Sequence, residues 1–210
     1  MRGSRQRLLV WLSRWRVDVG TVAGVAILAF AQPTRASVAM WLPLVAVALA
    51  LRTWARGHLE RHQHLVRTGP YAFVRHPLYL GSFLLGLAFA GMTRIPVFVP
   101  VFFIAFVAMY LPKALREEAF LRERHPGAYA EYAGQVGAFI PRPWVRHGSP
   151  ASAQRFSWRR VLRHREWKTW VGVLGLLAAM WALAGGFVHA TRVERLFHPA
   201  HPAAEHHRVS

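Results

Sequence analysis

Two stretches of the sequence contain closely spaced polar side chains of the kinds that bind charged small molecules. In the first, Arg75 and His76 stand directly before Pro77, a residue suited to the first position of a helix. A helix N-terminus carries partial positive charge and free N–H groups, so this position favours an anion. Residues 68–71, Thr-Gly-Pro-Tyr, predict a turn just before it. A basic interface anchor ahead of a close-packed helix is the alternative interpretation.

The second stretch begins at Lys113. Lys113 and Glu117 are four residues apart, so on a helix they share one face. Glu117 and Glu118 are two of only nine acidic residues in the chain. A solvated helix with i,i+4 ion pairs is the alternative here. Because both stretches flank the same pair of apolar runs, we expect them to converge on one site.

The composition shows what surrounds these residues. The 210 residues include 27 Lys and Arg against 9 Asp and Glu, yet 54% are hydrophobic. Such a chain segregates charge from hydrophobicity along the sequence, which argues against a soluble globular domain. The absence of cysteine excludes a disulfide scaffold, a thiolate zinc site and a thiol nucleophile.

Five uncharged runs predict membrane helices, so the predicted fold class is an all-α integral membrane protein with about five transmembrane helices. A 30 Å hydrocarbon core needs roughly 20 residues, and the first three runs are shorter and must borrow their flanks. The runs are Val19–Ala31, Ala36–Leu51, Leu78–Thr93, Ile95–Leu111 and Trp170–Val188. Arg94 predicts a tight outer turn between the third and fourth runs, which then form a hairpin.

The positions of Lys and Arg predict the orientation. If every run spans, 22 of the 27 basic residues fall on one side, which the positive-inside rule makes cytoplasmic together with the N-terminus and the expected shared site. A cleaved secretory signal ending near residues 29–31 is a competing interpretation of the N-terminal run.

The sequence divides into five parts on this basis. The basic segment before the last run favours contact with anionic lipid headgroups over nucleic acid. The histidines near the C-terminus lack a fixed geometry, and we assign no metal. The parts are a basic N-terminus (1–16), two membrane helices (17–51), a core with the hairpin (52–145), a basic linker (146–168), and a last helix with a His-rich tail (169–210).

In order and spacing, these motifs resemble the isoprenylcysteine carboxyl methyltransferase family and its relatives among phospholipid N-methyltransferases. The resemblance covers roughly residues 50–143. The matching residues are Leu65-Val66, Thr68-Gly69-Pro70-Tyr71, Arg75-His76-Pro77, Tyr79, Gly81, Glu117-Glu118, Leu121, Gly127, Tyr129, Tyr132 and Ile140-Pro141.

This resemblance implies a membrane methyltransferase that uses S-adenosylmethionine and acts on a lipophilic, isoprenoid or phospholipid-like acceptor at a carboxylate or an amine. His64 departs from the family, whose histidine falls at Gln63 here. The cofactor-binding residues that it implies are His64, Leu65, Val66, Tyr71, His76, Pro77, Leu78, Tyr79 and Glu117.

Lys113, Glu118 and Arg75 are the candidate catalytic residues. Lys113 occupies the position of the family's substrate-orienting arginine, and a lysine cannot make the bidentate fork of arginine to a carboxylate. Methyl transfer is therefore better supported than prenylcysteine esterification. Glu118 is a candidate base for an amine or hydroxyl acceptor, and Arg75 is a candidate anion ligand.

Two other functions remain as alternatives. Membrane sterol reductases have a similar hairpin and a similar segment around Arg75 but bind NADPH. A non-catalytic lipid-binding protein of the same fold is the second alternative.

Overall fold

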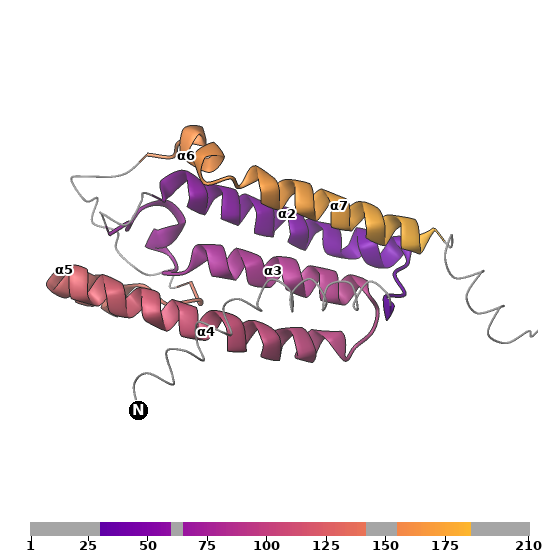
Figure 1. The fold of residues 1–210 in the computed structure, drawn as a ribbon, viewed down its shortest axis with the longest axis horizontal. Helices are drawn as coiled ribbons and strands as arrows, with labels where there is room; N and C mark the ends of the chain where they lie inside the picture. Colours follow the sequence, from indigo (N-terminus) through magenta and orange to yellow (C-terminus); the bar gives the residue numbers. More distant parts are fainter. Residues whose placement is uncertain (1–29, 60–64, 142–154, 186–210) are drawn as a thin grey trace, which may run out of the picture.

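The computed structural model describes residues 30–59, 65–141 and 155–185, and the regular elements in these ranges are helices (Figure 1). The all-helical prediction is therefore confirmed for this part of the chain. In order, the elements are α2 (Arg35–His58), the 3₁₀ helix η1 (Gly69–Ala72), α3 (Pro77–Met92), α4 (Phe98–Arg124), α5 (Pro126–Gln135), α6 (Trp158–Arg163) and α7 (Trp167–Ala184).

Three of the described helices, α2, α4 and α7, are long and apolar enough to cross a membrane. Three such helices in one chain indicate a multi-pass integral membrane protein. Helix α3 is apolar but has only 16 residues, about 24 Å at 1.5 Å per residue, against a hydrocarbon core of about 30 Å. The prediction of about five spans is therefore met in part, because α3 alone is too short for a full crossing.

Several sequence predictions concern residues outside the described ranges. They are the basic N-terminus, the first run apart from its last two residues, His64, most of the basic linker and the His-rich tail.

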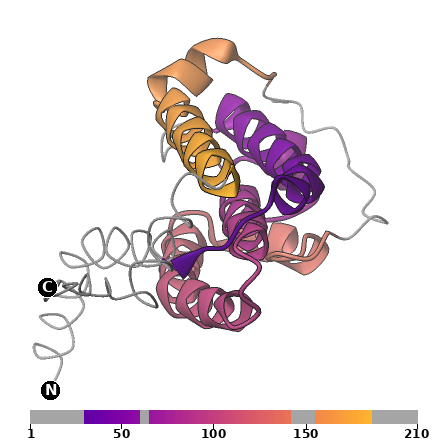
Figure 2. The ribbon, with the colours of Figure 1, turned by 90° about the vertical axis from the view of Figure 1, so that its right-hand side faces the viewer.

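Helix α3 lies between α2 and α4, and α7 packs on the side of α2 (Figures 1 and 2). The main apolar core joins α2, α3 and α7 through Val45, Ala48, Leu85, Met92 and Val173. Within α4 only Ala114 is buried, and this helix turns large apolar side chains outward. An exposed apolar face of this kind suits contact with lipid.

Local sequence signals fix the helix ends. A capping box between Thr34 and Ser37 begins α2, and Pro77 is the first residue of α3, as predicted. The tight turn predicted at Arg94 is confirmed, because Arg94 adopts φ 60° and its amide donates to the Gly91 carbonyl.

Helix α4 does not end with its apolar run. It begins at Phe98 and continues through Pro112 to Arg124 over 27 residues. Lys113 and Glu117 therefore lie on the same continuous helix as the membrane-facing residues. The C-terminal half of α4 lies at the same end of the bundle as the end of α2 and the start of α3 (Figure 1).

A short backbone contact joins two segments that are far apart in sequence. Val74 and Gly137 form an isolated parallel bridge, and the amides of Arg75 and His76 donate to the carbonyls of Gly137 and Ala138 at 2.8 and 3.1 Å. The chain that follows α5 is thereby held against the start of α3.

Close packing of α2 on α3 depends on Gly81. A Cβ at this position would lie 2.5 Å from Cγ of Arg52 and 3.2 Å from the carbonyl oxygen of Ala48. Gly81→Ala should therefore lower the free energy of unfolding by about 1–3 kcal/mol, the usual cost of overpacking. Thermal unfolding of the purified protein in detergent measures this.

The matched control is Gly175→Ala in α7, where a Cβ would meet nothing within 4 Å. This substitution should leave the melting temperature unchanged or raise it slightly, because alanine favours a helix over glycine by up to about 1 kcal/mol. Equal melting temperatures for the two variants would contradict the packing role of Gly81.

Candidate functional site

A cavity of about 970 Å³ opens where the end of α2, the start of α3, the second half of α4 and α5 meet. Both polar stretches of the sequence contribute to its wall, as their predicted convergence requires. The predicted site residues on this wall are Leu65, Val66, Tyr71, Arg75, His76, Leu78, Tyr79, Lys113 and Glu117.

Tyr79 connects α3 to α4 at this wall. Its hydroxyl donates a hydrogen bond of 2.8 Å to Oε2 of Glu117. The ammonium of Lys113 lies 5.1 Å from the centre of the Tyr79 ring, within cation–π range. Lys113 and Glu117 thus share one helix face, as their spacing predicts, and both contact the same tyrosine.

His76 is buried directly behind this tyrosine. The two rings are stacked with centroids 5.4 Å apart and an interplanar angle of 13°. Nε2 of His76 lies 3.0 Å from Oε1 of Glu118, and the Arg75 guanidinium lies 3.3 Å from the same oxygen. Glu118 is therefore held behind the cavity wall by two basic groups rather than on the wall itself.

The Arg75 side chain has unused hydrogen-bonding capacity. Its Nε is buried and has no hydrogen-bond partner among the described residues, while Nη1 lies 3.5 Å from the hydroxyl of Tyr129. A buried donor without a partner costs free energy, so an acceptor from a bound molecule would relieve this arrangement.

The predicted turn before α3 is present as the 3₁₀ helix η1. Gly69 adopts φ +61°, and a Cβ there would lie 2.7 Å from the ring of His58, so both conformation and space require glycine. The Tyr132 hydroxyl donates to the Tyr71 carbonyl at 2.7 Å, which ties η1 to α5. Burial raises the pKa of both phenols, so each is neutral at physiological pH.

Besides Glu118, one predicted site residue lies off the wall and another is not described. Pro77 is buried in the first turn of α3 and does not reach the wall, and His64 lies outside the described ranges. No group of three His, Cys, Asp or Glu side chains among the described residues is placed to hold a metal ion.

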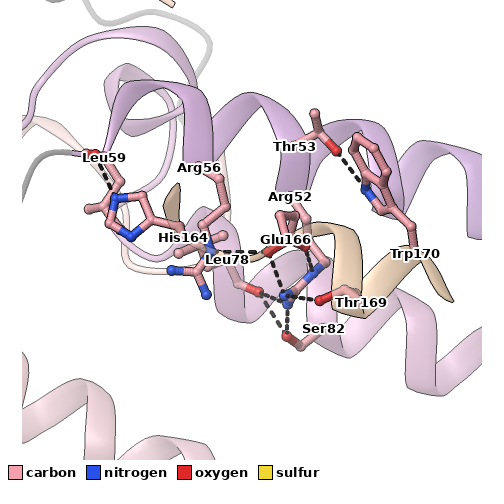
Figure 3. A network of polar contacts seen from close by, with 10 residues as sticks. All are labelled: Arg52, Thr53, Arg56, Leu59, Leu78, Ser82, His164, Glu166, Thr169 and Trp170. Atoms are coloured by element: carbon pink, nitrogen blue, oxygen red, sulfur yellow. Dashed lines mark hydrogen bonds and ion pairs between the residues drawn. The ribbon is translucent and has the colours of Figure 1, made fainter. Parts of the chain in front are cut away.

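Sequence reasoning missed the contribution of α2. Arg52 and Arg56 also line the cavity, and both bind the carboxylate of Glu166 at the start of α7 (Figure 3). Two signals were available. The arginines are four residues apart on one helix face, and Glu166 is an isolated acid in a strongly basic segment.

All three guanidinium nitrogens of Arg52 have partners (Figure 3). Nε and Nη2 donate to the two oxygens of Glu166 at 2.8 and 3.2 Å, and Nη2 also donates to Thr169. Nη1 donates to Ser82 and to the Leu78 carbonyl. Arg52 therefore joins α2, α3 and α7.

Comparison with known proteins identifies part of the chain. Residues 25–123 match the sequence model of the isoprenylcysteine carboxyl methyltransferase (ICMT) family. The match covers slightly less than half of the chain, and the predicted resemblance to this family is confirmed. Helices α5, α6 and α7 lie beyond the matched residues.

Three curated relatives share part of this sequence. The nickel-cobalt-cadmium resistance protein NccN of Alcaligenes xylosoxydans is 33% identical over 47% of this chain and 46% of its own. The cobalt-zinc-cadmium resistance protein CzcN of Cupriavidus metallidurans is 35% identical over the same shares. The protein-S-isoprenylcysteine O-methyltransferase of Saccharomyces cerevisiae is 32% identical over 39% of this chain and 34% of its own. The match thus spans less than half the length of each relative.

Proposed function

We propose that this protein is a membrane-embedded methyltransferase that uses S-adenosylmethionine to methylate a lipophilic acceptor. One observation carries the proposal. The hydrogen bond between Tyr79 and Glu117 brings the two motif segments together on the wall of one cavity. The match of residues 25–123 to the ICMT family supports the reaction class.

The residues of the wall fit the charges of this cofactor. Glu117 presents a carboxylate suited to its amino group, and the partnerless Nε of Arg75 beside the start of α3 suits its carboxylate. Leu65, Val66 and Leu78 supply apolar surface. A cavity of about 970 Å³ lies within the range of small-molecule sites.

Bound S-adenosylmethionine supplies a methyl group already activated by positively charged sulfur. The chain must then hold the acceptor in line and exclude water, and such positioning supplies about 7–11 kcal/mol in favourable cases. Lys113 places a positive charge beside Tyr79, where it can attract an acidic acceptor. A carboxylate acceptor needs no base, whereas an amine would release its proton to His76, which lines the cavity and contacts Glu118 behind it.

A lipophilic acceptor can approach along the contact between α3 and α4. Tyr79 packs on Tyr110, Tyr110 stacks on Phe106 at 4.2 Å, and Phe106 packs on Phe83. This row of aromatic rings continues the cavity wall toward the exposed apolar face of α4. The acceptor's polar head would then lie in the cavity, at the end of the bundle that the positive-inside rule makes cytoplasmic.

Glu117→Ala and His76→Ala should each abolish binding of S-adenosylmethionine while the protein still inserts and folds. The first removes the partner of Tyr79, and the second removes the ring stacked on it. Isothermal titration of the purified protein measures the loss, and Glu123→Ala, an exposed position on the same helix, is the matched control. Wild-type affinity in both site variants, or binding of NADPH in place of S-adenosylmethionine, would contradict the proposal.

Lys113→Ala should lower acceptor turnover and leave the affinity for S-adenosylmethionine largely intact. The reason is that Lys113 contacts the ring face of Tyr79, whereas Glu117 binds its hydroxyl. Labelled S-adenosylmethionine incubated with the protein and its own membrane lipids, followed by mass spectrometry, identifies the acceptor and measures its turnover. Loss of cofactor binding in this variant would place Lys113 in the cofactor site instead.

The names of two relatives favour a physiological setting for this reaction. Both NccN and CzcN are metal-resistance proteins by name. We infer that the methylated product contributes to tolerance of nickel, cobalt, zinc or cadmium.

Deletion of the gene should therefore lower growth of the host in one or more of these metals, and the wild-type gene should restore it. The Glu117→Ala gene should fail to restore growth, whereas the Glu123→Ala gene should succeed. Full rescue by Glu117→Ala would separate metal tolerance from methyl transfer.

A further inference from the structure

The polar cluster at the start of α7 contains more positive than negative charge. The carboxylate of Glu166 is 1% exposed and contacts two guanidinium groups, those of Arg52 and Arg56. One carboxylate neutralises one of them, so the cluster retains one positive charge. The position of that charge decides what the cluster can bind.

The unused capacity lies on Arg56. Every guanidinium nitrogen of Arg52 has a partner, and its side chain is 12% exposed. Arg56 uses only Nε, which donates to Oε2 of Glu166 at 3.1 Å, and its side chain is 27% exposed. Within the described part of the chain, its two terminal nitrogens have no hydrogen-bond partner.

The contact with Glu166 also determines where those nitrogens point. A guanidinium is planar and rigid, so once Nε is fixed the orientation of the terminal fork is fixed as well. Figure 3 shows the terminal nitrogens of Arg56 turned away from Glu166. Arg56 lines the cavity, and its charge opposes the rise that burial causes in the pKa of Tyr71. The fork therefore faces the cavity.

The backbone around Glu166 supports this arrangement. The backbone of Arg165 adopts φ 54°, a conformation that residues other than glycine rarely take. Such strain persists only where surrounding contacts determine the conformation. Here those contacts include the ion pairs of Glu166 and the bond from the ring of Trp170 to Thr53.

The charge of the whole cavity indicates the class of ligand. Its wall carries five Lys and Arg side chains, against Glu117 on the wall and Glu118 and Glu166 behind it, an excess of two positive charges. S-adenosylmethionine carries a sulfonium, an ammonium and a carboxylate, so its binding would add one net positive charge to the cavity. An anionic acceptor would lower this repulsion, and a cationic one would increase it.

We propose that the terminal fork of Arg56, fixed by Glu166 from outside the family-matched segment, binds the acidic group of the acceptor, a carboxylate or a phosphate. This inference rests on the proposed function and narrows it, because it assigns the acceptor to the acidic lipids. Arg56 supplies the bidentate recognition that Lys113 cannot provide from α4.

The test uses the full chain in nanodiscs of zwitterionic phosphatidylcholine at pH 7.5. Octyl phosphate and octanoate are titrated calorimetrically, with uncharged octanol as the matched probe and empty nanodiscs as the background. The wild type should bind both anions at least about tenfold more tightly than octanol, a difference worth about 1.4 kcal/mol. Arg56→Gln should remove this preference and leave the affinity for S-adenosylmethionine unchanged.

Two further variants distinguish recognition by the oriented guanidinium of Arg56 from general attraction of anions by positive charge. Arg56→Lys keeps the charge, but its compact ammonium would pair with Glu166, so it should bind the anions no better than Arg56→Gln. Arg159→Gln removes one positive charge from the exposed face of α6, away from the cavity, and should bind like the wild type. If either Arg56→Gln or Arg56→Lys keeps the full wild-type preference for the anions over octanol, the assignment of Arg56 to the acidic group of the acceptor is wrong.

The remaining outcomes distinguish the source of the anion. If Arg56→Gln weakens the binding of S-adenosylmethionine about tenfold and leaves the affinity for octyl phosphate unchanged, the fork binds the carboxylate of the cofactor. The assignment of the fork to the acceptor is then wrong. Glu117→Ala should show the opposite pattern, with the cofactor lost and the anion preference kept. If the wild type binds no S-adenosylmethionine but keeps an Arg56-dependent preference, the methyltransferase proposal fails and the anion site stands.

Discussion

A charged side chain between apolar helices must find partners, and Arg52 meets this requirement in a way that orders the bundle. Arg52 lies near the end of α2 with a side chain that is 12% exposed, and a buried charge without partners costs several kcal/mol, which favours any packing that satisfies it. Arg52 binds Ser82 on α3 and both Glu166 and Thr169 on α7. Gly81 leaves the space for its stem. The three helices are therefore fixed relative to one another at the end where α3 begins.

The start of α3 is held from its other side by backbone contacts. The segment after α5 bonds to Arg75 and His76, and Phe139 packs on the His76 ring with centroids 5.4 Å apart. Because α4 continues past the apolar run, α5 and this segment return to the same end of the bundle. The stack of His76 on Tyr79 is thus supported by elements on both sides of the cavity.

The sequence predicted what local chemistry determines. Pro77 as a helix start, the turn before it, the turn at Arg94 and the shared face of Lys113 and Glu117 all follow from neighbouring residues. The length of α3 also followed from the sequence, because the uncharged run Leu78–Thr93 lies between Pro77 and the turn at Arg94, and α3 spans Pro77–Met92.

The α2–α7 part of the site was not predictable in the same way. Arg52 and Glu166 are 114 positions apart, and their contact depends on how α7 packs against α2. Hydropathy indicates that α7 is a membrane helix, but it does not say which neighbour that helix takes. The i,i+4 spacing of the arginines predicts a shared face and leaves the acid that they bind unidentified.

This arrangement separates the residues that hold the bundle from those that face a ligand. Arg52 and Glu166 are almost fully enclosed and bond to several helices, so a change in either disturbs the packing of α2, α3 and α7. Lys113 and Arg116 are exposed on α4, where Ala114 is the only buried residue. Under the proposed function, substitutions on the cavity face of α4 would therefore change which acceptor is recognised without disturbing the Arg52 framework. Lys113, which stands where the family has an arginine, lies on this cavity face of α4. Arg56 lies between the two groups, because it is anchored in the framework through Nε and directed into the cavity through its fork.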